Sequence, residues 1–540
     1  MLGSELVVVL CTAVLLCSLA ARRWGLPAPV LLLACGILLG LIPALAEVEL
    51  PPEAVLFLFL PVLLYWESIS TSLREIRSNL RGIVLMGTLL VIVTAWAVAV
   101  AAHALGLPWG PAWVLGAAIA PTDATAVGAL ARVLPNRYVT VLRAESLIND
   151  GTALVVYGVA VAATAGTEAL DAVDVSGRFL LAFAGGIAAG ALTAWAGVRV
   201  RRWIQDPLLS NVVTILSPFT AFVLAEWVQA SGVLAVVVAG LAMGRLGPRV
   251  IQADTRRQMT AFWSLATFLL NGALFVLVGL ELPRAISELT RGELLRGLVL
   301  VGVVTVVIVA VRLVYLFSTT YLIRLLDRRE SQRARRISNR ARVVSGLAGF
   351  RGAVSLAAAL ATPRSTAAGT PFPDRDLIIF VAAGVIVVTL VLQAPLLPAV
   401  ARWARLPGDT VARTEELRFA QASAINDALE AMPRLGAELG TQQQVVDELA
   451  AEYSRRLSVL NALRNEADKD DDGATRALTR AGQYRELGLA LIAQKRNTLI
   501  RLRDERRIDD TVLLRLQSRL DVEEIRLAAP HDAADETREE

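Results

Sequence analysis

Thirteen long apolar segments run through this sequence, and they limit its possible folds more than any other feature. Most of them reach the roughly 20 residues that an α-helix needs to cross the hydrocarbon core of a bilayer. Hydrophobic residues make up 55% of the 540-residue chain, which is rare for a soluble protein of this length. We therefore expect an all-α membrane protein with about thirteen transmembrane helices. The segments cover residues 4–21, 27–44, 53–68, 82–104, 111–131, 139–163, 178–198, 207–228, 231–244, 261–281, 296–322, 344–362 and 376–400.

The loops between these segments alternate in charge. Every second loop is rich in arginine, as at residues 74–81 and 324–342, whereas loops such as residues 43–53 are acidic. Arginine-rich loops remain on the cytoplasmic side of a cell membrane. We therefore expect the N-terminus outside the cell and the C-terminus in the cytoplasm, which requires an odd number of spans.

The chain changes character near Pro407, where the apolar segments stop. Residues 1–402 form the predicted membrane domain, and residues 403–540 form a charged cytosolic tail with amphipathic helical stretches. The segment DKDDDG at 468–473 resembles the start of a calcium-binding loop, but the later ligand positions hold Arg476 and Thr479, so a solvated linker is the better interpretation. The acidic end, HDAADETREE, is predicted to be disordered.

Few residues suit a resident cofactor. The two histidines, His103 and His531, are far apart in the sequence, which argues against a histidine metal site. All three cysteines lie in the first two apolar segments, where buried packing is more plausible than a disulfide framework. We expect no enzymatic activity, no cofactor and no nucleic-acid partner; the bilayer and transported ions remain as partners.

Two aspartates lie deep inside apolar segments. Asp123 is about 12 residues into the fifth segment, and Asp150 is about 12 residues into the sixth, which runs in the opposite direction. At 1.5 Å per residue each lies roughly 18 Å deep, near the middle of a core about 30 Å thick. Because a carboxylate is costly in lipid, both are predicted to face a water-filled cavity and a cation.

The neighbours of these aspartates are rich in oxygen. Thr122, Ser146 and Asn149 supply hydroxyl and amide groups, and Ser146 lies four residues before Asp150 on the same helix face. Such ligands suit a hard cation such as Na⁺ or Li⁺. The same carboxylates can bind protons instead, so proton and cation would compete for one site. This competition is the minimal requirement for exchange.

Two of the segments have irregular patches. Pro121 precedes Thr122 and disfavours a continuous helix in the fifth segment. The twelfth segment contains GLAGFRGAVSLA around Arg351. We expect broken helices there, in an inverted repeat of segments 1–6 and 8–13, because interrupted spans free carbonyls and helix ends for ion binding.

Glu145 needs a positive partner within the membrane. The intramembrane arginines at comparable depth are Arg312 and Arg351, and depth alone does not choose between them. The only lysines, Lys469 and Lys495, lie in the tail, so any fixed intramembrane countercharge must be an arginine. Glu67 is a further candidate for lining the cavity.

The segments APTDATAV, ESLINDGTALV, SGVLAVVVAGL, FLLNGALFVLVGLEL and GFRGAVSLAAAL resemble the successive signatures of bacterial Na⁺/H⁺ exchangers of the NhaP/NHE type. The resemblance covers nearly the whole membrane region, and the bacterial branch also has a similar tail. It implies a homodimer in which each chain has a dimerisation domain and a mobile six-helix core. The core would move like an elevator to give alternating access.

The resemblance also implies roles for individual residues. Asp150 would bind the ion and carry the proton, with ligands from Asp123, Thr122 and Ser146. Asn149 stands where electrogenic relatives have a second aspartate, which implies electroneutral exchange. Glu145 would pair with Arg312, while Arg351 would stabilise the broken twelfth span. Ala124 replaces a proline that is frequent in the family, so the form of the break in the fifth span is open.

The predicted function is antiport of Na⁺, or of Li⁺ or K⁺, against H⁺ for pH and sodium homeostasis. A K⁺-selective antiporter is the nearest alternative. A cation channel with a regulatory tail would not need proton competition, and an ion-sensing receptor would need a signalling motif that the tail does not show.

Overall fold

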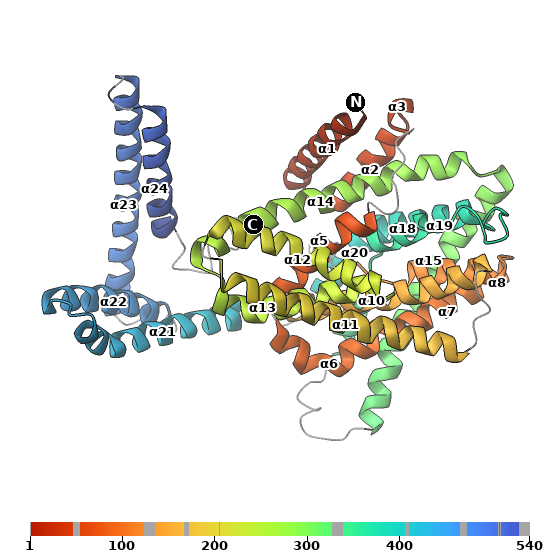
Figure 1. The fold of residues 1–540 in the computed structure, drawn as a ribbon, viewed down its shortest axis with the longest axis horizontal. Coiled ribbons are helices and arrows are strands. Elements are labelled where there is room, and N and C mark those ends of the chain that lie inside the picture. Colours follow the sequence, from red (N-terminus) through yellow and green to blue (C-terminus); the bar gives the residue numbers. More distant parts are fainter. Residues whose placement is uncertain are drawn as a thin grey trace. The chain divides into compact units, whose positions relative to one another are not determined.

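The computed structural model describes residues 2–46, 55–123, 136–166, 172–204, 206–326, 338–405, 410–464, 472–505, 507 and 509–528. Within these residues the chain is helical, and the β structure consists of an isolated bridge between Ser365 and Pro371. This confirms the predicted all-α class. The chain divides into two compact units, Met1–Pro407 and Gly408–Glu540, whose helices are labelled in Figure 1.

The first unit contains the apolar helices. In the described part of the chain, nine are long and apolar enough to cross a membrane, and three shorter apolar helices accompany them. The total of thirteen spans stays a prediction. The helices are α1 (Leu2–Trp24), α2 (Ala28–Gly40), α3 (Pro43–Ala46), α5 (Leu60–Ser70), α6 (Leu73–Gly87), α7 (Leu89–Ala104), α8 (Trp109–Ile119), α10 (Asn136–Ala165), α11 (Ala172–Arg201), α12 (Pro207–Trp227), α13 (Gly232–Val250), α14 (Ala253–Ser287), α15 (Arg291–Leu326), α17 (Asn339–Leu347), α18 (Ala353–Leu360), α19 (Arg375–Val388) and α20 (Ala394–Ala404).

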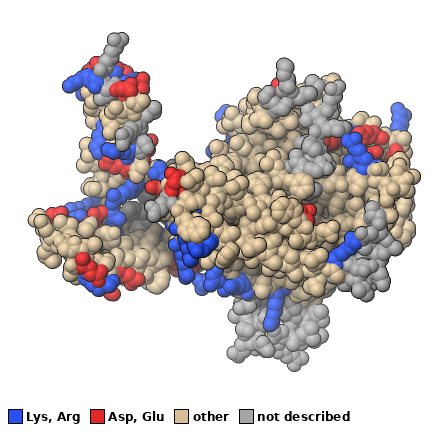
Figure 2. All heavy atoms as spheres, in the orientation of Figure 1, with Lys and Arg blue, Asp and Glu red and all other residues tan. Residues whose placement is uncertain are grey.

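The surface of the first unit is apolar over a wide area. Large hydrophobic side chains such as Leu16, Trp195 and Leu216 are exposed. Figure 2 shows one face of this unit with few charged side chains, most of them near its edges. A soluble monomer rarely exposes so large an apolar surface, whereas a lipid-facing surface has this composition.

Several predicted spans are interrupted. The helix of the fifth segment, α8, ends at Ile119, and residues 124–135 of that region, including Ala124, lie outside the described residues. The twelfth segment is divided into α17 and α18 by residues 348–352, as predicted. In the third and thirteenth segments, short π-helical stretches, Val55–Phe59 and Thr389–Gln393, precede α5 and α20.

The fourth segment holds an interruption that the sequence did not predict. It consists of α6 and α7, which meet at Thr88. The Thr88 hydroxyl donates a hydrogen bond to the carbonyl of Val84 at 2.6 Å, and the Thr88 backbone departs from helical values at φ −115° and ψ −68°. A threonine hydroxyl that bonds back to the preceding turn often accompanies such a break.

Helix α10 lies between two buried apolar clusters. One cluster extends through α7, α8, α15, α18 and α19 and includes Leu142 and Tyr157 of α10. The other joins α5, α11, α12 and α13 and includes Leu147 of α10. Leu154 packs against both clusters. The helix that carries Asn149 and Asp150 is therefore covered on two sides by apolar packing.

The second unit is formed by α21 (Thr410–Glu438), α22 (Gln443–Arg464), α23 (Asp472–Asp504) and α24 (Asp510–Ala528). Consecutive helices pack against one another. Ion pairs join α23 to α24: Lys495 lies 3.0 Å from Glu523, and Arg496 pairs with Asp521 and Glu524. The predicted helical tail is confirmed as helical. The acidic end and the start of the DKDDDG segment lie outside the described residues.

Candidate cation-binding site

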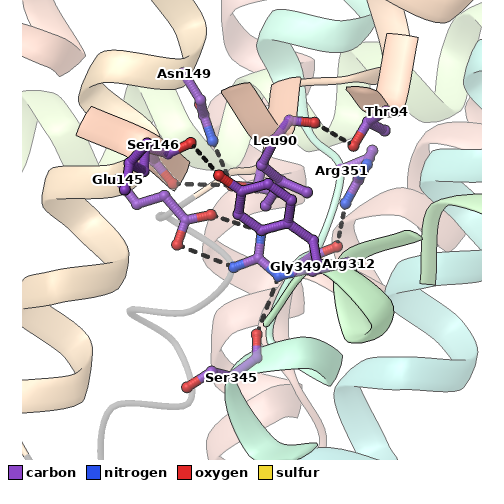
Figure 3. Close-up of polar contacts among 12 residues, drawn as sticks. Leu90, Thr94, Glu145, Ser146, Asn149, Arg312, Ser345, Gly349 and Arg351 are labelled. Carbon is purple, nitrogen blue, oxygen red and sulfur yellow. Dashed lines mark hydrogen bonds and ion pairs between the residues drawn. The ribbon is translucent and has the colours of Figure 1, made fainter. Parts of the chain in front are cut away.

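The residues after α8 cross the segment between α17 and α18. The backbone N–H of Asp123 donates to the carbonyl of Phe350 at 2.8 Å. Arg351 donates from Nε to the carbonyl of Ile119, the last residue of α8, at 2.9 Å. Its Nη1 donates to the carbonyl of Gly349 at 2.6 Å (Figure 3). The guanidinium of Arg351 therefore binds carbonyls from both interrupted segments.

The crossing is tight at Gly352. A methyl group added to Gly352 would lie only 1.6 Å from Oδ2 of Asp123. Any side chain there would overlap the carboxylate, so the position requires glycine. The half-buried carboxylate of Asp123 thus lies directly against the backbone that begins α18, where the partial positive charge of a helix N-terminus is found.

A buried polar stripe on α10 faces this crossing. Ser146, Asn149 and Asp150 are 5%, 1% and 5% exposed. The Asn149 Nδ2 donates to the hydroxyl of Thr122 at 2.7 Å, and the Ser146 hydroxyl lies 3.4 Å from the same oxygen. The structure therefore brings Thr122 together with Ser146 and Asn149, although 24 and 27 residues separate them in the sequence.

Some oxygens of this region have no hydrogen-bond partner within the described structure. They are Oδ1 of Asp150, Oδ1 of Asn149 and the hydroxyl of Ser355 on α18. Buried polar atoms normally find a partner, so each of these atoms calls for an explanation. For Asp150 the cost is highest, because a buried carboxylate needs a proton, a donor or a cation.

Glu145 forms an ion pair with Arg312 of α15. Nη1 and Nη2 of Arg312 lie 2.6 and 3.1 Å from the two carboxylate oxygens of Glu145, and Nε donates to the carbonyl of Ser345 on α17 at 3.1 Å (Figure 3). Both side chains are almost fully buried. Two parallel N–H···O bonds satisfy the carboxylate, so Glu145 is fully partnered. Arg351, the other arginine considered from the sequence, binds backbone carbonyls instead.

A small cavity of about 10 Å³, enough for roughly one water molecule, lies beside this ion pair. Glu145 and Arg312 line it on one side, with Thr122, Asn149 and Arg351. The remaining lining residues are Met86, Leu90, Val91, Thr94 and Ala120. Polar groups from α7, α10, α15 and the segments after α8 and before α18 therefore meet at one place.

Three further residues near the site were missed by sequence reasoning. Arg143 of α10 lies 4.0 Å from Glu67 of α5. Gly87 at the end of α6 permits close contact with α10, since a methyl group there would lie 2.6 Å from the Ile148 side chain. The hydroxyl of Thr389 lies 3.4 Å from the backbone nitrogen of Arg351. Of these, Arg143 alone gave a signal, as an arginine within a predicted span.

Comparison with known proteins agrees with this architecture. The family model described as "Sodium/hydrogen exchanger, transmembrane" matches residues 8–403. The chain belongs to this family. It is 45% identical to an uncharacterized Na⁺/H⁺ exchanger of Mycobacterium tuberculosis, over 98% of this chain and 97% of the relative. It is 31% identical to a sodium, potassium, lithium and rubidium/H⁺ antiporter of Bacillus pumilus, over 69% of this chain and 57% of that protein.

The fold is similar to that of a solved antiporter. The sodium proton antiporter MjNhaP1 from Methanocaldococcus jannaschii aligns with a TM-score of 0.57 at 18% identity, covering 74% of this chain and 99% of MjNhaP1. The exchanger described here is thus a multi-pass membrane protein with the fold of this antiporter. As a member of the sodium/hydrogen exchanger family, it is a cation/proton antiporter.

Proposed function

We propose that this antiporter exchanges Na⁺, or the related ions Li⁺ and K⁺, for protons at the carboxylate of Asp150. The observation that carries the proposal is the buried Oδ1 of Asp150, which has no hydrogen-bond partner. A cation or a proton stabilises such an oxygen, and binding of one displaces the other. One carboxylate thereby serves both transported species.

The proposed cation ligands are Asp150, Asp123, Ser146 and Thr122, and Asn149 is proposed as a positioning residue. Because the Asn149 amide donates to Thr122, it ties the end of the interrupted span to α10. The Thr122 hydroxyl is then free to donate toward Ser146 and leaves a lone pair of Ser146 for a cation. Glu67 is proposed as a supporting residue at the edge of the site.

The same arrangement supports the proposal of electroneutral one-for-one exchange. Asn149 is neutral, so the adjacent residues Asn149 and Asp150 of α10 carry a single negative charge, that of Asp150. The buried arginines do not add a titrating group, because Arg312 is paired with Glu145 and arginine stays protonated. One Na⁺ moving inward would therefore balance one proton moving outward.

For the transport cycle we propose alternating access by an elevator-like core in a homodimer, with the C-terminal unit in the cytoplasm. The interrupted segments beside α10 support this, because binding sites of such transporters lie at broken helices. The apolar cluster formed by α5, α11, α12 and α13 supplies a surface along which a body that contains α10 could move. The proposed physiological role is pH and sodium homeostasis in the cell membrane.

A vesicle assay tests the proposal. Purified full-length protein is reconstituted into liposomes with a trapped pH dye, and Na⁺, Li⁺ or K⁺ is added outside. Antiport predicts that the lumen becomes alkaline as the cation enters and protons leave. The rate is then measured with the membrane potential clamped at two values, and electroneutral exchange predicts equal rates. A response to K⁺ alone would favour the K⁺-selective alternative, and cation entry without proton movement would indicate a channel.

A further inference from the structure

Ser355 of α18 carries a buried hydroxyl group to which the proposed function gives no role. Its side chain is 1% exposed, and its Oγ has no hydrogen-bond partner within the described structure. A serine inside a helix often bonds back to a carbonyl of the preceding turn, as Ser68 does to Leu64 at 2.6 Å. Buried hydroxyl groups without any partner are rare, so the unbonded hydroxyl of Ser355 needs an explanation.

The position of Ser355 within α18 directs its hydroxyl toward Asp123. Gly352 is the N-cap of α18, and Ser355 is the third residue of the helix. A side chain at the third position points back toward the N-cap residue, as in the capping box. The carboxylate of Asp123 fills the space beside Gly352, where an added methyl group would lie 1.6 Å from Oδ2. The Ser355 hydroxyl therefore lies on the side of α18 that faces this carboxylate.

The neighbours of Ser355 in α18 hold the helix in this orientation. Val354 packs against the apolar cluster of α5, α11, α12 and α13, and Leu356 belongs to the cluster that extends through α7, α8, α15, α18 and α19. Ala357 lies in a third cluster, with side chains of α5 and α14. The helix also packs against α10, which carries Asp150. Apolar packing on several sides thus fixes a polar group next to the proposed cation site.

We propose that Ser355 is a further ligand of the transported cation, an inference that rests on the proposed function of Asp150. A hydroxyl oxygen has two lone pairs and no charge, which suits a hard monovalent cation. The ligands then come from three places: the residues after α8, the polar stripe of α10, and α18. Because the hydroxyl does not titrate, it strengthens cation binding without itself holding the exchanged proton. Ser355 thereby sets the affinity of the site for the cation relative to the proton.

Transport kinetics of the full-length protein in liposomes test this ligand. Ser355→Ala removes one oxygen atom and adds no bulk, whereas Ser355→Thr keeps the hydroxyl. The matched control is Ser217→Ala in α12, a buried serine whose hydroxyl donates to the carbonyl of Val213 at 2.6 Å. The KM and the maximal rate for Na⁺ are measured for each variant at a neutral and at an alkaline pH. Thermal unfolding establishes that all variants fold.

Loss of one oxygen ligand in Ser355→Ala should raise the KM for Na⁺ about tenfold at both pH values, with an unchanged maximal rate. Ser355→Thr and the Ser217 control should keep the wild-type KM. An unchanged KM in Ser355→Ala, a fall in the maximal rate alone, or an equal rise in KM in both Ser355 variants overturns the proposal. A rise that disappears at alkaline pH also overturns it, because it would reflect altered proton binding at Asp150.

The variant Asp150→Asn separates this inference from the function on which it rests. If Asp150→Asn loses exchange while Ser355→Ala keeps the wild-type KM, the role of Ser355 alone is wrong. If Asp150→Asn exchanges at the wild-type rate, the proposed function fails, and the role of Ser355 fails with it.

Discussion

Glu145 and Asp150 lie little more than one turn apart on α10, and both are buried, yet their surroundings differ. Both oxygens of Glu145 receive hydrogen bonds from Arg312, which is itself anchored to the carbonyl of Ser345. Asp150 keeps a buried oxygen without a partner. One helix therefore holds a carboxylate that is paired within the fold beside a carboxylate with an unpartnered oxygen, for which we propose a transported cation or proton as partner.

The largest expected effect is loss of exchange at the unpartnered carboxylate. Asp150→Asn removes the negative charge and, with it, the ability to bind either a cation or a proton. We expect no cation-dependent pH change above that of empty liposomes, with thermal stability unchanged or higher because a buried charge is gone. The measurement is the dye assay together with a melting curve in detergent. Exchange at the wild-type rate would remove Asp150 from the site.

Substitution of Glu145, whose carboxylate is paired with Arg312, should lower the stability of the fold. Glu145→Gln leaves the Arg312 guanidinium buried without its countercharge, which costs about 3–5 kcal/mol of stability. We expect a clearly lower melting temperature. The double variant Glu145→Met with Arg312→Met removes both charges and should recover most of the loss. A single variant as stable as the wild type would show that the pair is not a structural element.

Competition between proton and cation for Asp150 should change the apparent KM for Na⁺, an effect smaller than the loss of exchange in Asp150→Asn. A cation binds only the deprotonated carboxylate, so lowering the pH raises the apparent KM for Na⁺, toward a limit of about tenfold per pH unit for one competing proton. The maximal rate for Na⁺ measured at two pH values separates this from inactivation. A steeper dependence than tenfold per unit would mean that more than one proton competes and would contradict one-for-one exchange.

The smallest effect is expected at the Glu67–Arg143 contact between α5 and α10. The two groups are 4.0 Å apart, and 16% of the Glu67 side chain and 37% of the Arg143 side chain are exposed. Partly exposed pairs of this kind contribute at most about 1 kcal/mol. Arg143→Gln should therefore lower the melting temperature far less than Glu145→Gln. An equal loss would show that this pair is as important to the fold as the buried one.

The sequence predicted the parts of this molecule that depend on composition and on helix periodicity. The apolar segments indicated the class of fold, and the glycine-rich patch around Arg351 indicated the break between α17 and α18. The break at Thr88 was not predicted, because threonines such as Thr94 and Thr152 bond back in the same way and leave their helices continuous. The depth of a residue in the membrane can be estimated from residue counts, but the neighbours toward which its side chain points cannot.

The direction in which each side chain points around its helix axis determines which residues meet at the site. Depth left Arg312 and Arg351 equivalent as partners for Glu145, and the structure separates them by their neighbours. Asn149 was interpreted from the sequence as a neutral substitute for a charge. In the structure it also donates to Thr122, which lies 27 residues away in the chain. Such a bond follows from the crossing of two interrupted segments and has no local signature.

The bonds of the two buried arginines have a mechanical consequence. Arg312 fastens α10 to α15 and, through Ser345, to α17, while Arg351 fastens the end of α8 to the segment before α18. The ion pair and the hydrogen bonds that join these helices are costly to break inside a membrane. Any displacement of Asp150 along the membrane normal therefore carries α8, α15 and α17 with it. Probes attached to these helices should keep constant separations throughout the transport cycle.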